Sequence, residues 1–373
     1  MKIINARVYS NNFSFEKHDL FIKGELLSSP FSTDYVFDAQ NLYAIPSLID
    51  IHFHGAFGHD FMDADYEGLK AISIYEASVG VGTIVPATMT MSATSITKAL
   101  KNAVAFKAPQ NGADLEGIYL EGPFISPNKV GAQNPQYVKE ADLDFFLKLQ
   151  ALACDLIKVI VVSPETEKAC EFIKKVSSQV KVSLGHTCCD YDKACEAIAC
   201  GASELTHIFN AMNPLLHRSP GPIAAAALDK NVKAELICDG IHIHEAMVRL
   251  AFKLFSKERI IMISDSMMAT GLEDGEYSLG GQKVRVCGKK ATLEDGTLAG
   301  SVCNLFLMLK SAVSMGISLE DAVRACTYNP ALNVGILDKV GILKAGRRAN
   351  ILFLDDALNL KGILHHGLWL KKP

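Results

Sequence analysis

Short apolar runs alternate with stretches of helical periodicity through most of the chain. The apolar runs lie at residues 42–54, 83–90, 115–122, 156–164, 181–187, 204–210, 234–240 and 260–266. A short apolar run bounded by turn residues indicates a buried strand, and apolar residues three and four positions apart indicate a helix. The helical stretches span residues 66–80, 95–106, 140–154, 165–177, 191–200, 222–230 and 244–255. This alternation predicts an α/β protein with parallel strands joined by right-handed crossovers.

The number of repeats narrows the fold further. Eight predicted strands with helices between them predict a closed (β/α)₈ TIM-like barrel, which we place at residues 45–339. An open, doubly wound sheet is the alternative arrangement of the same elements.

The two ends of the chain do not follow this repeat. Residues 1–44 and 340–373 carry short alternating runs separated by turn residues, which is typical of small β-strands. We expect both termini to meet in one small β-sandwich domain. A hairpin-like segment at residues 275–300 follows the last predicted barrel strand and belongs either to a loop or to that sandwich.

Composition and charge exclude several classes of partner. Of the 373 residues, 49% are hydrophobic and 21% are charged, and the net charge of −4 offers no basic surface for nucleic acid or for a membrane. No apolar run approaches the roughly 20 residues that cross a bilayer. Residues 1–13 lack the apolar core of a secretion signal, and the ten cysteines include no CxxC pair. We therefore expect a cytoplasmic protein with reduced thiols.

Polar side chains gather at the ends of the predicted strands, the rim where barrel enzymes place their catalytic groups. They are His52, His54, Glu121, His186, His207, Asp239, His242 and Asp265. A single histidine in an apolar strand is usually a satisfied core residue. Five histidines and three carboxylates at the same end of several strands instead predict a shared site.

The residue types in this set favour a metal ion. His52 and His54 are two positions apart, so in a strand both side chains point to the same face. Glu121 is predicted to reach the same ion or to bridge to a second one, with His186 and His207 opposite. Imidazole and carboxylate ligands suit Zn²⁺ or Fe²⁺ better than Mg²⁺. We expect one or two divalent ions per chain.

Such a site activates water for hydrolysis. A divalent metal lowers the pKa of water from 15.7 to roughly 7 and polarises a carbonyl group. A nearby carboxylate can take the proton of that water and pass it to a leaving nitrogen. Asp265 is the candidate for this role, so the residues indicate a metal-dependent hydrolase that acts on an amide-like bond.

Several longer strings carry a family resemblance. In chain order they are LEGPFISP, GHT, THIFNAMNP, HRSPGP, DGIHI, SDSMMATG and GTLAGS. Together with the HxH string of the first predicted strand, they resemble the N-acetylglucosamine-6-phosphate deacetylases, a family of the amidohydrolase superfamily. The resemblance extends over essentially the whole chain, and LEGP and HxFNAM are its most specific strings.

The resemblance implies a role for each position. Glu121, His186 and His207 would form the primary metal site, His52 and His54 would hold a second ion, and Asp265 would be the general acid and base. For the substrate, it implies that the sugar is held around Asn210 and Ala211 and the 6-phosphate by Arg218 and His242. One or both of the phosphate-binding residues would reach in from a partner subunit, since the family is commonly dimeric. We therefore expect a homodimer that binds a phosphorylated amino sugar.

One position departs from the family pattern. Gln133 stands in KVGAQNP where the family usually has a histidine that orients the carbonyl of the substrate. Glutamine can donate a hydrogen bond but cannot carry a charge. The substitution predicts a lower rate or a different preferred acyl group.

Three functions are compatible with these residues. The leading hypothesis is removal of the acetyl group from N-acetylglucosamine 6-phosphate. A second keeps the barrel but changes the substrate, either to N-acetylgalactosamine 6-phosphate or to a cyclic amide. A third is a sugar-phosphate sensor without catalysis, for which Gln133 is the only support.

Overall fold

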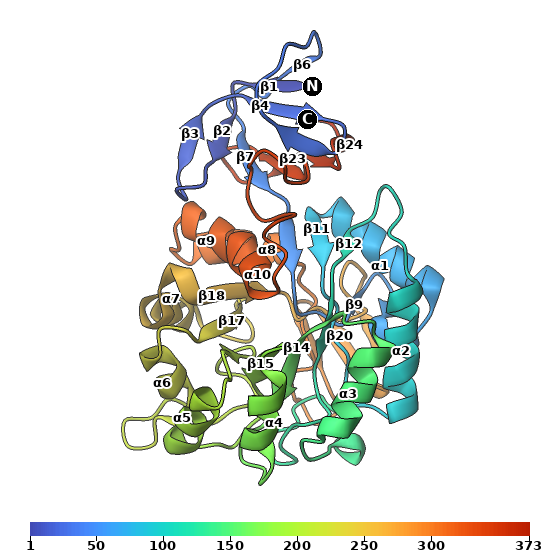
Figure 1. Cartoon of the computed structure of the whole chain (residues 1–373), viewed down its shortest axis with the longest axis vertical. Helices are drawn as coiled ribbons and strands as arrows, with labels where there is room; N and C mark the ends of the chain where they lie inside the picture. The colour runs from blue at the N-terminus through green and yellow to red at the C-terminus, as the bar shows by residue number, and fades with distance from the viewer.

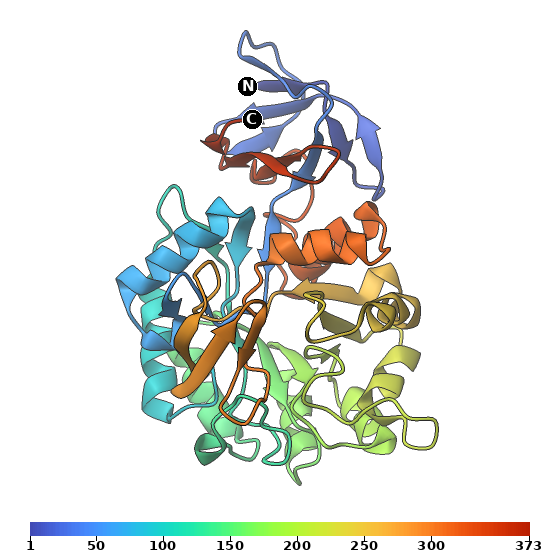
Figure 2. The ribbon, with the colours of Figure 1, turned by 180° about the vertical axis from the view of Figure 1, so that it is seen from behind.

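The computed structural model describes residues 1–373 and has two parts. A large region of alternating strands and helices, the β/α region, comprises β8 to β21 and α1 to α10. A smaller all-β region comprises β1 to β7 and β22 to β24 and is called here the terminal sheets. Both chain ends lie in the terminal sheets, at the same end of the molecule in two opposite views (Figures 1 and 2).

The β/α region alternates strands and helices in the order expected. Its parallel strands are β8 (Leu48–Asp50), β11 (Val81–Ile84), β12 (Asp114–Leu115), β13 (Ile118–Leu120), β14 (Ile157–Val162), β15 (Lys181–Leu184), β16 (Glu204–Leu205), β17 (Lys233–Ile237) and β18 (Ile260–Ile263). Its helices are α1 (Tyr66–Ser78), α2 (Ala93–Ala105), α3 (Leu143–Leu152), α4 (Ala169–Val176), α5 (Tyr191–Ala199), α6 (Gly221–Leu228), α7 (Glu245–Arg259), α8 (Leu305–Ser314), α9 (Leu319–Cys326) and α10 (Tyr328–Asn333). None of these helices combines the length and apolar character needed to span a membrane.

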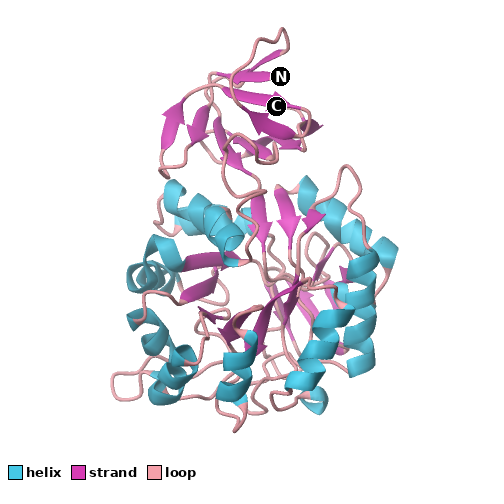
Figure 3. Cartoon of the chain, viewed as in Figure 1, coloured by secondary structure: helices cyan, strands magenta, loops and turns pink.

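The parallel sheet is curled, and its helices lie on the outside (Figure 3). Six strands pair in the order β13-β14-β15-β16-β17-β18, and three pair in the order β12-β11-β8. A parallel bridge between Ala87 and Tyr119 connects the two sets. At the other edge the backbone N–H of Asp265, just after β18, donates to the carbonyl of His52, just after β8. The ends of these strands therefore face one another across one common mouth.

The helices predicted from periodicity are confirmed to within a few residues, because their signals are local. The α1 helix starts after Asp65, whose carboxylate accepts from the backbone N–H groups of Glu67 and Gly68. The α5 helix starts after Asp190, which caps the N–H of Lys193. Such side-chain caps satisfy N–H groups that have no partner inside the helix.

The strand boundaries are less regular than the apolar runs suggest. The run at residues 42–54 is split into β7 (Tyr43–Pro46) and β8, and β8 ends at Asp50. His52 and His54 therefore lie just beyond the strand and not inside it. The extended chain after β8 still directs both imidazoles into the mouth, where they are buried.

The terminal sheets are built from both ends of the chain. Their strands are β1 (Lys2–Ile4), β2 (Arg7–Tyr9), β3 (Phe15–Lys17), β4 (Leu20–Lys23), β5 (Leu26–Ser28), β6 (Val36–Asp38), β7, β22 (Ile351–Leu354), β23 (Leu360–His365) and β24 (Leu368–Lys371). They form two sheets, ordered β5-β4-β1-β6 and β24-β23-β22-β7-β2-β3, around a separate core of 13 buried residues. Because β7 pairs with β22 as far as Pro46, this region extends slightly beyond the predicted limit at residue 44.

The segment after β18 forms a sheet of its own. Its strands β19 (Gly275–Leu279), β20 (Gln282–Cys287) and β21 (Lys290–Thr292) pair only with one another and do not join the terminal sheets. The side chain of Gln282 donates to the carbonyl of Ala132, 2.6 Å away. The β19–β21 sheet is thus anchored beside the mouth of the β/α region. A separate two-stranded sheet, β9 (Gly55–Ala56) with β10 (His59–Asp60), follows β8.

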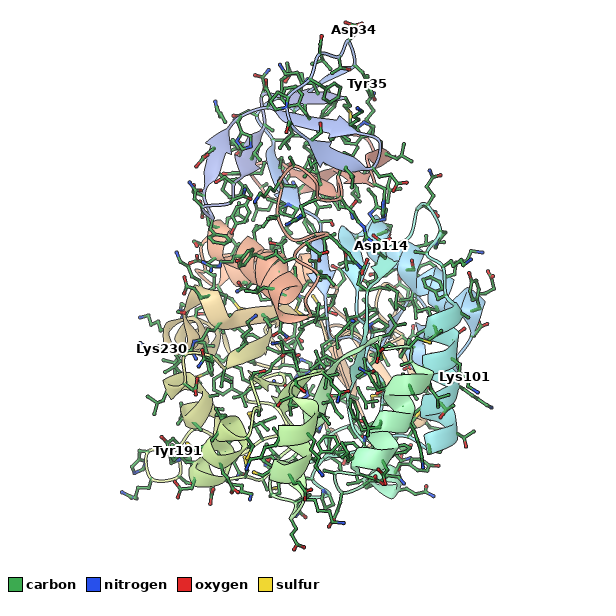
Figure 4. All side chains as sticks on the ribbon, in the orientation of Figure 1. Asp34, Tyr35, Lys101, Asp114, Tyr191 and Lys230 are labelled. Carbon is green, nitrogen blue, oxygen red and sulfur yellow. The ribbon has the colours of Figure 1, made fainter.

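A polar cluster joins the two regions at Asp114, which lies at their boundary (Figure 4). His366, in the turn after β23, lies 2.8 Å from Asp114 Oδ2 through its Nε2, and Arg348 Nη1 lies 3.1 Å from the same oxygen. Asp114, His365 and His366 place possible metal-ligand atoms within 4.8 Å of one another. The guanidinium of Arg348 already neutralises Asp114, however, so the cluster acts as an ion-pair junction and would repel a further cation.

The junction predicts a pH-dependent stability. The hydrogen bond to Asp114 raises the pKa of His366. Its contribution is therefore complete below the ordinary histidine pKa of about 6.5 and is lost as pH rises through the folded-state value. His366→Ala should lower the free energy of unfolding by about 1 kcal/mol at pH 6 and by less at pH 9. Thermal unfolding at both pH values, with exposed His18→Ala as the control, measures this; an equal loss at both would contradict it.

Candidate active site

A cavity opens at the mouth of the curled sheet and has a volume of about 240 Å³. Its lining residues come from loops that follow different strands. They are His54, Met89, Glu121, Gly131, Ala132, Gln133, His186, His207, Asn210, Ala211, His242, Asp265, Leu279, Thr297, Leu298 and Gly300. This volume is small beside the roughly 300–1,000 Å³ of typical ligand pockets, which suits a ligand of single-sugar size.

Glu121, directly after β13, is the centre of the polar wall. Its Oε1 lies 3.1 Å from His186 Nε2 and 3.2 Å from His207 Nε2. Its Oε2 lies 3.2 Å from His54 Nε2. Burial would raise the pKa of this carboxyl, but the charge of His52 and the hydrogen bonds from His186 and other imidazoles hold it well below its usual range. Glu121 is thus an ionised carboxylate shared by several imidazoles.

The donor atoms of this group fit a divalent cation. His186 Nε2 and His207 Nε2 are 3.1 Å apart, and both face Glu121 Oε1. The other ring nitrogen of His186, Nδ1, lies 2.9 Å from the carbonyl oxygen of Lys129, so it carries the proton and leaves Nε2 as a ligand. Two nitrogen lone pairs this close are stable only with a proton or a cation between them. The chemistry of the set therefore suits a metal.

A second group of possible ligands consists of His52, His54 and Asp265. Asp265 Oδ1 lies 3.2 Å from His54 Nε2 and 4.0 Å from His52 Nε2. The Nε2 atom of His52 is buried and has no hydrogen-bond partner, which costs free energy unless a cation occupies the site. Burial would raise the pKa of Asp265, but the hydrogen bond from His54 and the charge of His52 keep it below its usual range. Asp265 is therefore a carboxylate able to accept a proton.

The backbone is strained where these groups leave their strands. His186, His207 and Asp265 have φ values of 46°, 26° and 48°, in the left-handed region that side chains other than glycine rarely adopt. Such conformations persist only where surrounding contacts enforce them, and they are concentrated at functional sites. The turn at each strand end directs the side chain across the mouth instead of along the sheet.

Glycine is required directly after Glu121. Gly122 has φ of 74°, and a Cβ atom there would collide with the side chain of Thr90. A larger residue would displace Glu121 or the chain that carries Thr90. The glycine in LEGP thus has a local steric function beside Glu121.

Gln133 lines the cavity, and both ends of its amide are engaged. Its Oε1 accepts from the backbone N–H of Thr90 at 2.6 Å, and its Nε2 donates to Glu121 Oε2 at 2.5 Å. The Thr90 contact fixes which end of the amide faces Glu121. In the structure this glutamine therefore holds the Glu121 carboxylate in place.

The expected sugar- and phosphate-binding residues also reach the cavity, except one. Asn210 and Ala211 line it, and the amide nitrogen of Asn210 donates to the carbonyl of His207, which leaves Oδ1 free. His242 lines it as well, with Nδ1 2.7 Å from Asp239 Oδ2. Burial would lower the pKa of His242, but the hydrogen bond and charge of Asp239 raise it overall. Asp239 therefore favours the protonated form of the His242 ring at the cavity wall.

Comparisons with known proteins identify the family. The family model of the amidohydrolases matches residues 43–368. The chain belongs to the amidohydrolase family. Amidohydrolases depend on metal ions, and the two groups of possible ligands around Glu121 and Asp265 accord with that property.

Named relatives of this amidohydrolase include two sugar-phosphate deacetylases. It is 37% identical to an N-acetylglucosamine-6-phosphate deacetylase of Bacillus subtilis, over 90% of this chain and 86% of that protein. It is 34% identical to an N-acetylgalactosamine-6-phosphate deacetylase of Escherichia coli O157:H7, over 86% of each chain. Among solved structures, it resembles N-acetyl-D-glucosamine-6-phosphate deacetylase from Mycobacterium smegmatis, an aspartate-to-alanine variant in complex with N-acetyl-D-glucosamine-6-phosphate. The TM-score is 0.92 at 27% identity, covering 100% of this chain and 99% of the other.

Arg218 is the one expected substrate-binding residue that the amidohydrolase chain does not bring to its own cavity. It is exposed in the segment between β16 and α6 and is not among the lining residues. Nothing in the single chain holds its guanidinium in place. A contact with bound phosphate therefore requires a second subunit or a movement of this segment.

The structure adds residues that the sequence did not single out. Leu279, Thr297, Leu298 and Gly300 line the cavity from the β19–β21 sheet and the chain that follows it. Because these residues are apolar or small, their residue types do not mark them as part of a site. Only their position in the folded chain does. Glu235 is different: it is a charged residue inside the apolar run of β17, and it is completely buried beside His52. That buried charge was the sequence signal that could have identified it.

Proposed function

We propose that this amidohydrolase removes the acetyl group from N-acetylglucosamine 6-phosphate and produces glucosamine 6-phosphate and acetate. The observation that carries the proposal is a pair of possible ligand groups, Glu121 with His186 and His207 and Asp265 with His52 and His54. All of them except His52 line one small cavity, and His52 Nε2 lies 3.4 Å from Glu121 Oε1. The deacetylase names of relatives that match nearly the whole chain support this substrate class. The strings LEGP and HxFNAM, which carry the resemblance, contain Glu121, His207 and Asn210.

The proposal includes a finer description of the fold. We infer that the eight β/α units close into a (β/α)₈ barrel and that the terminal sheets form a small β-sandwich. The backbone hydrogen bond from Asp265 to His52 supports closure between the last and first units, and the 13-residue core supports the sandwich. We further propose a cytoplasmic enzyme that forms a homodimer.

One or two divalent ions, Zn²⁺ or Fe²⁺, are part of the proposed enzyme. Glu121, His186 and His207 would hold one ion, and His52 and His54 would hold the other. When bound, the metal supplies Lewis-acid polarisation of the amide carbonyl and eases deprotonation of water. The protein itself provides orientation, exclusion of bulk water and proton transfer.

Proton transfer is assigned to Asp265. Its Oδ1 would accept a proton from water as the water oxygen forms a bond to the acetyl carbon. The same carboxyl would then donate that proton to the amide nitrogen as the carbon–nitrogen bond breaks, which gives acetate and a free amine. The low pKa of Asp265 in the folded chain leaves the carboxylate ready to accept a proton at neutral pH.

Binding is assigned to residues around the same cavity. Asn210, Ala211 and Gln133 would contact the sugar and its acetyl group. His242, whose protonated form is favoured by Asp239, would bind the 6-phosphate together with Arg218 from a second copy of the chain. Arginine offers a planar pair of donors to phosphate, and charged histidine adds a further charge-assisted hydrogen bond.

Purified, metal-replete protein tests the proposal directly. With N-acetylglucosamine 6-phosphate it should release acetate and free amine in equal amounts. Unphosphorylated N-acetylglucosamine is the matched control and should react far more slowly. Failure to hydrolyse the phosphosugar, together with turnover of a cyclic amide or of an unphosphorylated amide, would reject this substrate.

A second candidate substrate is N-acetylgalactosamine 6-phosphate. It is favoured by the relative with that activity in its name, which is 34% identical to this chain. The two sugars differ only in the orientation of one hydroxyl group. Comparison of kcat/KM for the two epimers in one preparation decides between them.

Arg218 should control affinity for the phosphate. Arg218→Ala is expected to raise KM for the phosphosugar by roughly 10- to 100-fold with a smaller change in kcat, because charge-assisted hydrogen bonds contribute about 1.5–3 kcal/mol. Steady-state kinetics measure it, with exposed Lys230→Ala as a control for loss of a surface cation. An unchanged KM would show that Arg218 does not bind the substrate. That result would agree with a cyclic-amide substrate, which has no phosphate.

A further inference from the structure

Glu235 is a buried carboxylate beneath the proposed metal site and has no role in the mechanism above. It lies in β17, is fully buried, and does not line the cavity. A buried carboxylate is costly unless its oxygens are satisfied. Its partners therefore show what holds it there.

One oxygen of Glu235 binds the ring of His52. Oε2 lies 2.9 Å from His52 Nδ1 and also accepts from the backbone N–H of His207 at 3.2 Å. Because Nδ1 donates to this carboxylate, Nε2 is the ring nitrogen that would give up its proton when His52 binds a cation. That Nε2 faces Glu121 and Asp265 at 3.4 Å and 4.0 Å.

The other oxygen of Glu235 faces a second buried acid. Glu204 lies on the neighbouring strand β16, close enough for the charge of Glu235 to raise its pKa, and the Oε1 atoms of both residues are buried without a hydrogen-bond partner. A single proton shared between the two carboxyl groups would satisfy both atoms. Burial, followed by the charge of Glu235, raises the pKa of Glu204 well above its usual range, so Glu204 carries that proton. Its remaining oxygen accepts from Asn333 of α10 at 2.6 Å.

The plane of the His52 ring is also held from its face. The ring stacks on Tyr119 with centroids 4.1 Å apart and an angle of 24° between the planes. The hydroxyl group of Tyr119 is hydrogen-bonded to Thr206 at 3.0 Å. The ring therefore has one stacking partner and one hydrogen-bond partner, and only the hydrogen bond determines which nitrogen faces the cavity.

We propose that Glu235 is a positioning residue that acts through His52: it fixes the tautomer and the direction of the imidazole and so sets the affinity of the metal position next to His54 and Asp265. Glu204 and Asn333 hold Glu235 in place from the opposite side. The proposal rests on the proposed metal-dependent function but concerns metal binding, so its test does not depend on which substrate the enzyme hydrolyses.

Glu235→Leu tests this assignment because leucine fills the space without accepting a hydrogen bond. Zn²⁺ affinity, measured by competition with a chelating dye, should fall by about 10- to 100-fold for the ion next to His52. The ion held by Glu121, His186 and His207 should remain bound. In Co²⁺-substituted protein, the visible absorption bands of the His52 position should shift or disappear. Unchanged affinity and an unchanged spectrum would overturn the proposal.

A double-mutant cycle separates positioning from a general effect on the fold. If Glu235 acts through His52, adding Glu235→Leu to His52→Ala should cause no further loss of Zn²⁺ affinity. Additive losses would overturn the proposal. Glu76→Leu, which removes a different fully buried carboxylate on α1, is the matched control and should leave Zn²⁺ affinity unchanged.

A milder variant keeps the test decisive if the leucine variant does not fold. Glu235→Gln retains an oxygen that accepts from His52 but loses the charge, so Zn²⁺ affinity should fall several-fold; no change would count against the proposal.

The proposed function and the proposed role of Glu235 can fail separately. Wild-type protein that binds metal but releases no acetate from the phosphosugar would reject the substrate and leave the role of Glu235 standing.

Discussion

Replacing Asp265 with asparagine is expected to lower kcat by about 10²- to 10⁴-fold, the range for loss of a general acid and base. Asparagine has nearly the same shape and can still interact with His54, but its amide cannot take a proton from water. KM should change little because the carboxylate moves protons and does not hold the sugar. Acetate release under saturating phosphosugar measures the effect.

Two controls make this result specific. Metal content per chain should remain close to that of the wild type, so that loss of the ion does not explain loss of rate. Asp60→Asn removes a neighbouring buried carboxylate that caps the 3₁₀ helix at Phe61–Asp63, and asparagine is an equally good cap. That variant should keep most of its activity. If kcat falls only a few fold in Asp265→Asn, proton transfer belongs to another group. A sensor protein without catalysis would bind the phosphosugar both as the wild type and as Asp265→Asn, and neither would hydrolyse it.

Replacing Glu121 with glutamine should abolish both tight metal binding and activity. The carboxylate is the one anionic group within 3.2 Å of His186, His207 and His54 at the same time. A neutral amide cannot balance the charge of a divalent ion, so affinity should fall by more than the roughly 100-fold seen for outer-shell changes. Inductively coupled plasma analysis of dialysed protein measures the metal, and the acetate assay measures the activity.

Metal removal from the wild type provides the comparison. Chelation should abolish acetate release, and adding Zn²⁺ or Fe²⁺ back should restore it. The same additions should not rescue Glu121→Gln. A Glu121→Gln variant with full metal content and full activity would show that the ion, if there is one, lies elsewhere.

The fold was predictable where the signals are local. Helices α1 and α5 begin at Tyr66 and Tyr191, as the periodicity predicts, because their caps and apolar faces are set within a few residues. Strand limits were less accurate, since β16 has only two residues and β8 ends before His52. Pairing with neighbouring strands sets those limits, and pairing partners are far away in the chain.

The candidate site, like the fold, has a part that could be predicted from the sequence and a part that could not. The residue types at the ends of the apolar runs indicated a metal centre, because few other arrangements bring so many imidazoles beside carboxylates. Neither Gln133 nor Glu235 could be assigned to its observed partner. Gln133 meets Glu121 only because the 129–135 loop folds back over the cavity, and Glu235 meets His52 across the interior of the curled sheet.

The sequence by itself determined the order of strands and helices, the candidate ligands and the class of chemistry, since each depends on residue type and on spacing along a single element. Only the tertiary structure decided which nitrogen of each histidine faces the cavity, that Asp265 leaves β18 in a left-handed turn, and that Arg218 lies outside the cavity of its own chain. These three features depend on hydrogen bonds and packing between segments up to about two hundred residues apart. Such contacts form, and contribute free energy, only when the chain folds.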